Sequence, residues 1–542
     1  MRLCFIILIS IILFSCDNKV VHEIKTIKII TPEQVQIEIE KELFSFLEND
    51  SILIIDSIQL NAYSFFKKNY LKHLIWFNQS QLNSKGDSLI EIIKNCKYYG
   101  LIPEEYHYSK IYNEISVINK QKDSVNISSL VKADLLMSGA YYLMGANLNK
   151  GRLYPDSLLL QVDFKKLSIG WDSILLSGIN NNKIKAALDS LEPKHYNYRM
   201  LKKELAIILN DKNYFNFDSI PFISETDSLK KISLIKKNLT LQGFYDTLSS
   251  ASDSVKLTKA INGFQKKWFI QPDGKLGKYT KQALSYNRDK IIKQISMSME
   301  RWRWEESKFP IKYAFINIPA FWLVVFENDT VVMQSAVVCG KPETQTPILK
   351  SKIDHLLIYP YWNAPQSIAS KEILPAVQKD ISYLEKKHFE VIGKNNEVLD
   401  YTKLPWKKYS RNYLPVRFRQ RIGEENSLGI LKFNFYNPYG VYLHDTNSKR
   451  YFKTSSRAQS HGCIRLEQFS QLADFLIRDD SLHYTHDSLQ QYFSIQQQRK
   501  INLKNRLPIY TRYYTAHADS TGLKLYLDIY RKDEELMKLL YK

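Results

Sequence analysis

Cysteine is scarce in this sequence, and the positions of its five residues exclude a disulfide framework. Cys4 and Cys16 lie in a short apolar N-terminal stretch, whereas Cys96, Cys339 and Cys463 are widely scattered. Small secreted domains that depend on disulfides carry closely spaced cysteines. We therefore expect free thiols beyond the N-terminal stretch.

The sequence also lacks the motifs of several enzyme classes. It contains no phosphate loop of the form G-x-x-x-x-G-K-[ST], so no nucleotide is expected. Four residues offer potential zinc ligands: His444, Asp445, His461 and Cys463. They do not follow the short Cys-x2–4-Cys or His-x3–5-His spacings of zinc sites. We expect neither a metal nor another cofactor.

No apolar run is long enough to span a membrane. The run from Leu3 to Phe14 has about 12 residues, against the roughly 20 that a spanning helix needs. It suits the apolar region of a secretory signal. Leu13-Phe14-Ser15-Cys16 resembles a bacterial lipobox, which implies an acylated Cys16 and a periplasm-facing, lipid-anchored protein in the cell envelope. Inner or outer membrane stays open, and an ordinary signal peptide with a coincidental cysteine is the alternative.

The charge balance is strongly basic, with a net charge of +20. Such a surface favours nucleic acid, anionic lipid or an acidic cell-wall polymer, but the lysines are too scattered to choose among them. The segment Arg301-Trp302-Arg303-Trp304 interleaves basic and aromatic residues, as platforms for single strands do. Ile291, Ile295, Met299 and Trp302 nevertheless share one helical stripe, which favours an amphipathic helix packed on a neighbour. We expect no nucleic acid as partner.

The apolar period changes from helical to alternating along the chain. A capping pattern at Thr31-Pro32-Glu33-Gln34 begins a mostly helical region. From Ile311 onwards, short alternating segments predict strands, and Ile509–Tyr514 and Leu523–Ile529 are the last of them. The predicted fold class is multidomain α+β, with a mainly helical N-terminal part followed by a mainly-β domain.

A chain of 542 residues corresponds to about three or four domains. Between a helix that contains Gln265 and another that opens near Thr280, Asp273-Gly274 predicts a turn within a three-helix module. A charged segment between two sets of strands predicts an inserted lid. The expected segments are a signal peptide (1–15), a tether (16–30), a helical domain (31–230), the three-helix module (231–287), a connecting helix (288–306) and the mainly-β domain (307–542, lid at 370–428).

The strongest chemical signal is Ser460-His461-Gly462-Cys463, which follows His444 along the chain. A thiol attacks only as thiolate, so a catalytic cysteine needs a base or a cation beside it. The ordinary alternative for a lone cysteine is a small buried apolar residue. The combination of the thiol, an upstream histidine and a following Arg465 favours a nucleophile.

This combination resembles the signature of the L,D-transpeptidase catalytic domain of the YkuD type. Pro360–Pro365, which contains Trp362, and Tyr442–Thr446 also resemble family phrases. In the helical part, Tyr99–Pro103 and Gly151–Leu153 resemble the scaffold domain of the larger members. The three-helix module resembles a peptidoglycan-binding domain, with a helical spacer as the alternative.

The resemblance implies a role for each residue of the motif. Cys463 would be the nucleophile and His444 its base. His461 and the backbone N–H groups of Gly462 and Cys463 would steady the base and form an oxyanion hole. The remaining residues would face the substrate or shape the site. Arg465 would bind a substrate carboxylate, Tyr442 and Trp362 would line the pocket, and Ser460 would shape the loop.

The implied reaction is acyl transfer between peptidoglycan stem peptides. Cys463 attacks the third residue of a donor tetrapeptide and releases D-alanine. The amine of a diamino acid on an acceptor stem then resolves the thioester as a 3→3 cross-link. Capture by water would give an L,D-carboxypeptidase, and capture by another amine would anchor or release a protein. A non-catalytic wall-binding lipoprotein is the distant alternative. Carbapenem-type β-lactams are the implied covalent inhibitors.

Overall fold

The computed structural model describes residues 30–49, 74–120, 126–153, 170–217, 219–220, 228–454 and 456–541. The predicted signal peptide and the predicted lipidation site Cys16 lie outside these residues. The chain forms two compact units, one with residues up to 91 and 104–142, and one with residues 92–103 and 143–542. Among the described residues, no helix is long and apolar enough to cross a membrane.

The first unit is mainly helical. It draws on α1 (Pro32–Asn49), the hairpin β1 (Phe77–Asn78) and β2 (Gln81–Leu82), α3 (Ser84–Lys94), α4 (Tyr108–Lys120) and the first part of α5 (Ile127–Lys150). The predicted cap of α1 is confirmed, because Thr31 and Gln34 exchange hydrogen bonds between backbone and side chain. The buried Asp134 carboxylate accepts from the Trp76 backbone N–H at 2.8 Å, which fixes the chain before the hairpin.

The second unit begins with further helices. They are η2 (Cys96–Tyr99), α6 (Trp171–Asn180), α7 (Ile184–Leu191), α8 (Tyr196–Asn210), α9 (Ser228–Leu241), α10 (Asp253–Lys267), α11 (Lys278–Leu284) and α12 (Arg288–Trp304). In the three-helix module α9–α11, the buried Gln265 amide donates to Asp273 at 2.8 Å and to Thr280 at 3.0 Å. Its oxygen accepts from Gly274 N–H at 3.0 Å. Gln265 therefore ties the turn to both helices, while the module's ligand stays a prediction.

Helix α12, predicted as a connecting helix, is almost entirely buried. The Gln294 amide donates to the backbone carbonyls of Thr515 and Tyr526, each at 2.8 Å. Arg301 forms a buried ion pair with Asp533, and Trp302 stacks on Tyr514 at 4.6 Å between ring centroids. The amphipathic helix is confirmed, and its basic and aromatic side chains are engaged inside the protein.

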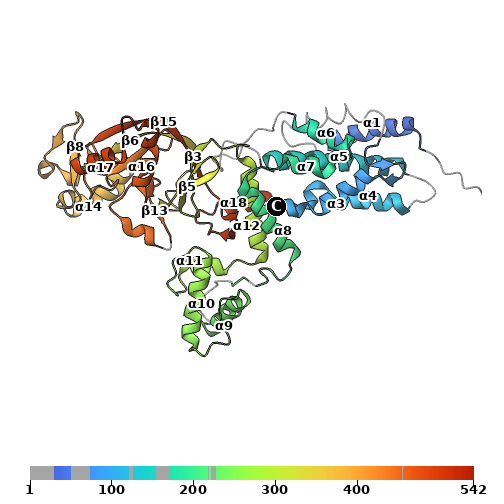
Figure 1. Ribbon diagram of the computed structural model, residues 1–542, viewed down its shortest axis with the longest axis horizontal. Coiled ribbons are helices and arrows are strands. Elements are labelled where there is room, and N and C mark those ends of the chain that lie inside the picture. Colours follow the sequence, from blue (N-terminus) through green and yellow to red (C-terminus); the bar gives the residue numbers. More distant parts are fainter. Residues whose placement is uncertain are drawn as a thin grey trace, which may run out of the picture. The chain divides into compact units, whose positions relative to one another are not determined.

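The mainly-β domain is built on a nine-stranded mixed sheet (Figure 1). Along the sheet the strands are β13 (Ala458–Ser460), β5 (Thr330–Gly340), β14 (Ile464–Leu466), β12 (Leu443–His444), β11 (Leu431–Phe435), β6 (Leu349–Ile358), β15 (Arg499–Arg512), β3 (Lys312–Asn317) and β4 (Trp322–Glu327). Strand β4 also pairs with β5, so the sheet closes on itself around an apolar core. The predicted α+β fold class is confirmed.

The predicted insertion (370–428) is part of a small folded subdomain, which begins earlier, at Trp362. It contains a four-stranded sheet in the order β7 (Trp362–Asn363), β10 (Arg417–Gln420), β8 (Phe389–Ile392), β9 (Val398–Leu399), together with η4 (Ala369–Ile373), α14 (Leu374–Lys379) and α15 (Tyr383–Lys386). Phe389, Trp406 and Phe418 are buried in its own apolar cluster. The subdomain therefore has an apolar core of its own, and its role as a lid stays a prediction.

The C-terminal end departs from the sequence prediction. Ile509–Tyr514 does supply the end of β15, but Leu523–Ile529 is not a strand of the main sheet. Strand β17 (Gly522–Leu525) pairs only with β16 (Ala516–Asp519), and α18 (Lys532–Leu540) follows. Leu523 and Leu525 are buried in the same cluster as residues of α8 and α12. The hairpin is therefore held by helices, which its alternating pattern does not reveal.

Candidate active site

Cys463 lies in a tight loop between β13 and β14, the two strands on either side of β5 in the main sheet. Strand β14 runs parallel to β12, with Leu443 beside Ile464 and His444 beside Arg465. Side chains at alternate positions of a strand share a face. The register therefore gathers Tyr442, His444, Cys463 and Arg465, far apart in the sequence, into one site.

The nucleophile loop is held by hydroxyl groups. Ser460 Oγ donates to the Cys463 carbonyl and accepts from Gly462 N–H at 3.1 Å. The buried Thr346 hydroxyl donates to the Gly462 carbonyl at 2.9 Å. Gly462 has a φ of +114°, where L side chains are strained. Ser460 holds the loop through the predicted side-chain-to-backbone bonds, whereas no role was predicted for Thr346.

The half-buried Cys463 is a thiol in the resting site. Burial raises its pKa because it disfavours the thiolate, whereas hydrogen bonds from Tyr442 and the charges of Lys432 and Arg465 lower it. The other thiols differ in environment: Cys96 and Cys339 are fully buried, and burial raises the pKa of Cys339 to about 12. Cys463 is therefore the thiol that a reagent or substrate can reach among the described cysteines.

His444 is buried, and burial followed by the charge of Arg465 lowers its pKa to about 3. Nδ1 faces the Asp445 carbonyl, and the ring also interacts with the Leu428 backbone. The imidazole is consequently neutral near neutral pH and has a lone pair for a proton. No hydrogen bond joins His444 to Cys463 within the described chain.

Tyr442 contacts both members of the predicted pair. Its hydroxyl hydrogen-bonds with the Cys463 thiol, and its ring lies 5.7 Å from the His444 ring between centroids. Trp362, at the start of the insertion, also hydrogen-bonds with this hydroxyl. Burial raises the pKa of Tyr442, so the phenol stays protonated and donates toward sulfur. The structure therefore brings Trp362 and Tyr442 to Cys463.

Arg465 lies on the same face and keeps unused donors. Its Nε and Nη1 are buried without a hydrogen-bond partner among the described residues. The guanidinium lies 5.4 Å from the centre of the Tyr451 ring. An unpaired buried donor costs free energy, so this guanidinium is suited to receive an anion.

His461 pairs with a residue of the insertion. Its Nε2 lies 2.7 Å from Glu372 Oε1, a residue of η4 in the insertion. Both side chains are partly exposed, with 35% and 53% of their surface accessible. The contact connects the nucleophile loop to the insertion, and a role of His461 in steadying the base stays a prediction.

Lys432 is a site residue that the sequence analysis missed. It lies opposite His444 in the β11–β12 register, and its Nζ lies 3.9 Å from the centre of the Tyr442 ring. In the sequence, Lys432 stands between the apolar Leu431 and Phe433, which are buried on one face of the strand, so Lys432 faces the other side. This alternation was the only indication in the sequence that Lys432 has a special place. Only the register shows that this face is the active site.

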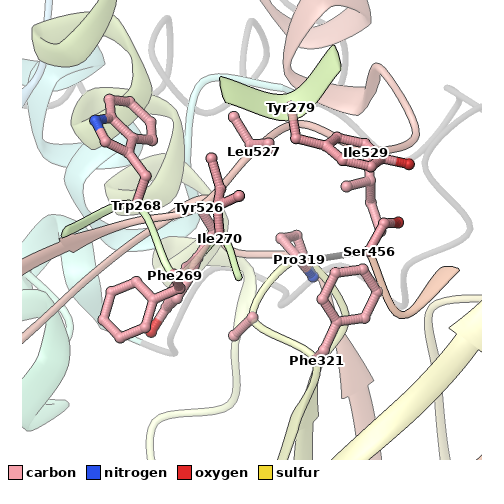
Figure 2. Close-up of a pocket in the computed structure, with 11 residues that line it drawn as sticks. Trp268, Phe269, Ile270, Tyr279, Pro319, Phe321, Ser456, Tyr526, Leu527 and Ile529 are labelled. Atoms are coloured by element: carbon pink, nitrogen blue, oxygen red, sulfur yellow. The ribbon is translucent and has the colours of Figure 1, made fainter. Parts of the chain in front are cut away.

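A separate pocket lies away from these residues (Figure 2). Phe269, Phe321 and Tyr526 are among the side chains that line it, and none of the predicted site residues is. Among the described residues, no group of three or more His, Cys, Asp or Glu side chains is placed to hold a metal ion.

Comparisons with known proteins match two segments of this chain. Residues 311–483 match the L,D-transpeptidase catalytic domain, YkuD, and residues 63–205 match a scaffold domain. A Haemophilus influenzae protein, provisionally described as an L,D-transpeptidase, is 28% identical over 222 residues. The matched segment covers 41% of this chain and 45% of that relative, so it spans about half of the relative's length.

Two solved structures show weak similarity. An L,D-transpeptidase (Yku) from Stackebrandtia nassauensis is 15% identical, covers 54% of this chain and 96% of its own, and has a TM-score of 0.19. The Ldtfm–avibactam carbamoyl enzyme is 10% identical, with 58% and 98% coverage and a TM-score of 0.17. Nothing further rests on them. From the two family matches, the chain contains a catalytic domain of the L,D-transpeptidase (YkuD) family, preceded by a scaffold domain.

Proposed function

We propose that this protein is a cysteine L,D-transpeptidase that forms 3→3 cross-links between peptidoglycan stem peptides through a thioester on Cys463. The observation that carries the proposal is the juxtaposition of a reachable thiol with an unpaired guanidinium. Arg465 lies two residues after Cys463 and retains free donors. A stem peptide offers a scissile carbonyl and carboxylates, which these two groups suit.

In the first step, the Cys463 sulfur attacks the carbonyl of the third residue of the donor. The thiol proton passes to His444 and then to the leaving amine of D-alanine, so the carbonyl–nitrogen bond breaks as the thioester forms. The carbonyls of Asp445 and Leu428 face the imidazole. They stabilise the imidazolium that forms in this step, because both of its nitrogens can donate. Catalytic contacts that are long in a free enzyme often tighten with substrate.

The oxyanion needs donors that are not already engaged. Gly462 N–H donates to Ser460 Oγ, so it is occupied in this conformation. Cys463 N–H has no hydrogen-bond partner within the described chain, which makes it the available backbone donor. One such donor is typically worth about 3 kcal/mol of transition-state stabilisation.

In the second step, the side-chain amine of the acceptor's diamino acid attacks the thioester. It loses a proton to His444, and the Cys463 sulfur leaves and regains a proton. The insertion over the site would keep water from competing with this amine. The high positive charge favours binding to an acidic wall polymer.

The test is incubation of the mature protein with disaccharide-tetrapeptides, followed by mass spectrometry of the products. We expect a 3→3 dimer with wild type and with Cys339→Ala, and none with Cys463→Ala. Release of D-alanine without a dimer would assign a carboxypeptidase instead. Product formation by Cys463→Ala would refute the nucleophile.

Inhibitor labelling gives a second test. We propose, from the resemblance to the L,D-transpeptidase family, that carbapenem-type β-lactams acylate Cys463 here. Intact-mass analysis should show one adduct, located on the peptide that contains Cys463 and absent from Cys463→Ala.

Two further proposals concern the envelope. Cys16 would carry the lipid that anchors the protein to a membrane, and the module α9–α11 would bind peptidoglycan. The first predicts an acylated N-terminus by mass spectrometry that is lost in Cys16→Ser. The second predicts co-sedimentation with purified sacculi that decreases when residues 231–287 are removed.

A further inference from the structure

Lys432 is a partly buried cation in the site that has no carboxylate partner. Within the described chain it forms no ion pair, although lysines such as Lys202 and Lys312 pair with carboxylates. Its ammonium lies over the Tyr442 ring at 3.9 Å from the ring centre. A cation in this position is attracted to the ring, and partial burial strengthens the attraction.

Electrostatics connect this ammonium to the nucleophile. Burial lowers the pKa of Lys432, and the negative charge of an ionised Cys463 raises it. The relation is reciprocal, because the charge of Lys432 lowers the pKa of Cys463. A lysine held out of water beside a thiol therefore favours the thiolate.

The usual cation beside a catalytic thiolate is an imidazolium. His444 cannot hold that charge at rest, because it is buried and its pKa is lowered to about 3. Six titratable or charged side chains surround Cys463 and its loop. Lys432 lies on β11, Tyr442 and His444 lie beside and on β12, and Arg465 lies on β14. His461 lies in the nucleophile loop, and Glu372 of η4 is its partner.

We propose that Lys432 is a positioning residue that holds the Tyr442 phenol against Cys463 and supplies the positive charge that stabilises the thiolate. This inference rests on the proposed function of Cys463 as nucleophile. Its geometric basis is the register of three neighbouring strands, β11, β12 and β14, which places Lys432, His444 and Arg465 in one row across the sheet. Tyr442 and Cys463 lie two residues from this row on the same face, and the Lys432 ammonium reaches the Tyr442 ring at 3.9 Å from its centre. Arg465 then remains available for a substrate carboxylate.

The test is the pH dependence of Cys463 alkylation by iodoacetamide in the full-length protein, read by peptide mapping. Lys432→Met should move the midpoint upward by about one pH unit and slow labelling at neutral pH about tenfold, because a nearby opposite charge shifts a pKa by roughly that much or more. Lys432→Arg should restore most of the midpoint. Lys500→Met is the matched control.

Lys500 suits this control because it lies in the same row of the sheet, where Lys432 and Lys500 both pair with Leu357, yet it is exposed. Its removal changes the net charge equally and should leave the midpoint unchanged. An equal shift in Lys500→Met would reduce the effect to overall charge and overturn the proposal. So would a wild-type midpoint in folded Lys432→Met.

Tyr442→Phe is a second variant that tests the proposal if Lys432→Met does not fold. It keeps the ring under the ammonium but removes the hydroxyl, so the midpoint should also rise, and a fixed midpoint would overturn the role of the phenol. Alkylation requires no peptidoglycan. A shifted midpoint in a protein that makes no cross-links would therefore refute the proposed function and leave the inference about Lys432 intact.

Discussion

At the scale of the residue, the site combines a protonated thiol with a neutral imidazole. Burial is the largest cause in both cases, since it raises the pKa of Cys463 and lowers that of His444. Neither group is charged at rest, so no thiolate–imidazolium pair has to be desolvated. Proton transfer then accompanies attack on the substrate.

These pKa directions predict the pH dependence of the enzyme. Free thiols have a pKa of about 8.5, and that of Cys463 lies above its ordinary value. The thiolate fraction, and with it the alkylation rate, should therefore keep rising from pH 6 to beyond pH 9. His444, with its pKa of about 3, should add no inflection between pH 5 and 7. A plateau by pH 7, or an acid limb near pH 6.5, would indicate a charged ion pair.

The conformation of Gly462 gives a second prediction. A Cβ there would meet only ordinary contacts, the nearest at 3.6 Å, so the φ of +114° is the constraint. Gly462→Ala should cost about 1–3 kcal/mol of backbone strain and displace Cys463, lowering kcat at least about tenfold. Gly423→Ala imposes a similar strain, at a φ of +134° in the insertion, and should leave kcat unchanged. Equal losses in both variants would contradict this local effect.

The sequence motifs predicted those site residues that lie within or beside a short motif. Cys463, Tyr442 and Arg465 belong to this group, and the register brings them together. Lys432 and Thr346 were missed, because their place depends on which strands are neighbours. His461 was placed near the base by analogy, yet a side chain at that position can turn toward either His444 or the insertion.

At the scale of the element, the subdomain that holds the insertion contacts both Tyr442 and the nucleophile loop. Trp362 hydrogen-bonds with Tyr442, and Glu372 pairs with His461 at 2.7 Å. The sequence placed the insertion but could not give its fold, because its strands are only two to four residues long. Deleting residues 384–414 would remove the buried Trp406 and unfold the subdomain, so a point substitution is the sharper test.

Glu372→Gln should loosen this contact while the insertion stays folded. Because an open site admits water, the ratio of hydrolysis to cross-linking should rise, with Cys463 still acylated. The ratio is read from the muropeptide products by mass spectrometry. Glu385→Gln is the control, since Glu385 pairs with Arg421 on the insertion surface. An unchanged ratio in Glu372→Gln would contradict a closing role for this contact.

At the scale of the whole molecule, α12 joins the C-terminal hairpin to the helical region of the second unit. The sequence predicted the helix and its apolar stripe, but not that its opposite face is buried too. The reason is that Arg301, Arg303 and Gln294 have polar side chains, which a pattern assigns to solvent. Here they find buried partners in Asp533, Glu300 and two backbone carbonyls.

This arrangement predicts that the β domain is not stable alone. A fragment of residues 307–542 would expose Leu523 and Leu525 and leave Asp533 without Arg301. Breaking a buried ion pair from one side costs about 3–5 kcal/mol. The fragment should unfold at a clearly lower temperature by calorimetry than residues 170–542, which keep α8 and α12. Equal unfolding temperatures would show that α12 is only a connector.

The central claim is that Cys463 carries the acyl group between donor and acceptor. The most direct measurement is the intact mass of the protein, quenched in acid within one turnover after mixing with a donor tetrapeptide and no acceptor. The account predicts an added mass equal to the donor without its D-alanine, located on Cys463 by peptide mapping and absent from Cys463→Ala. D-alanine release without any adduct, or an adduct on another residue, would contradict it.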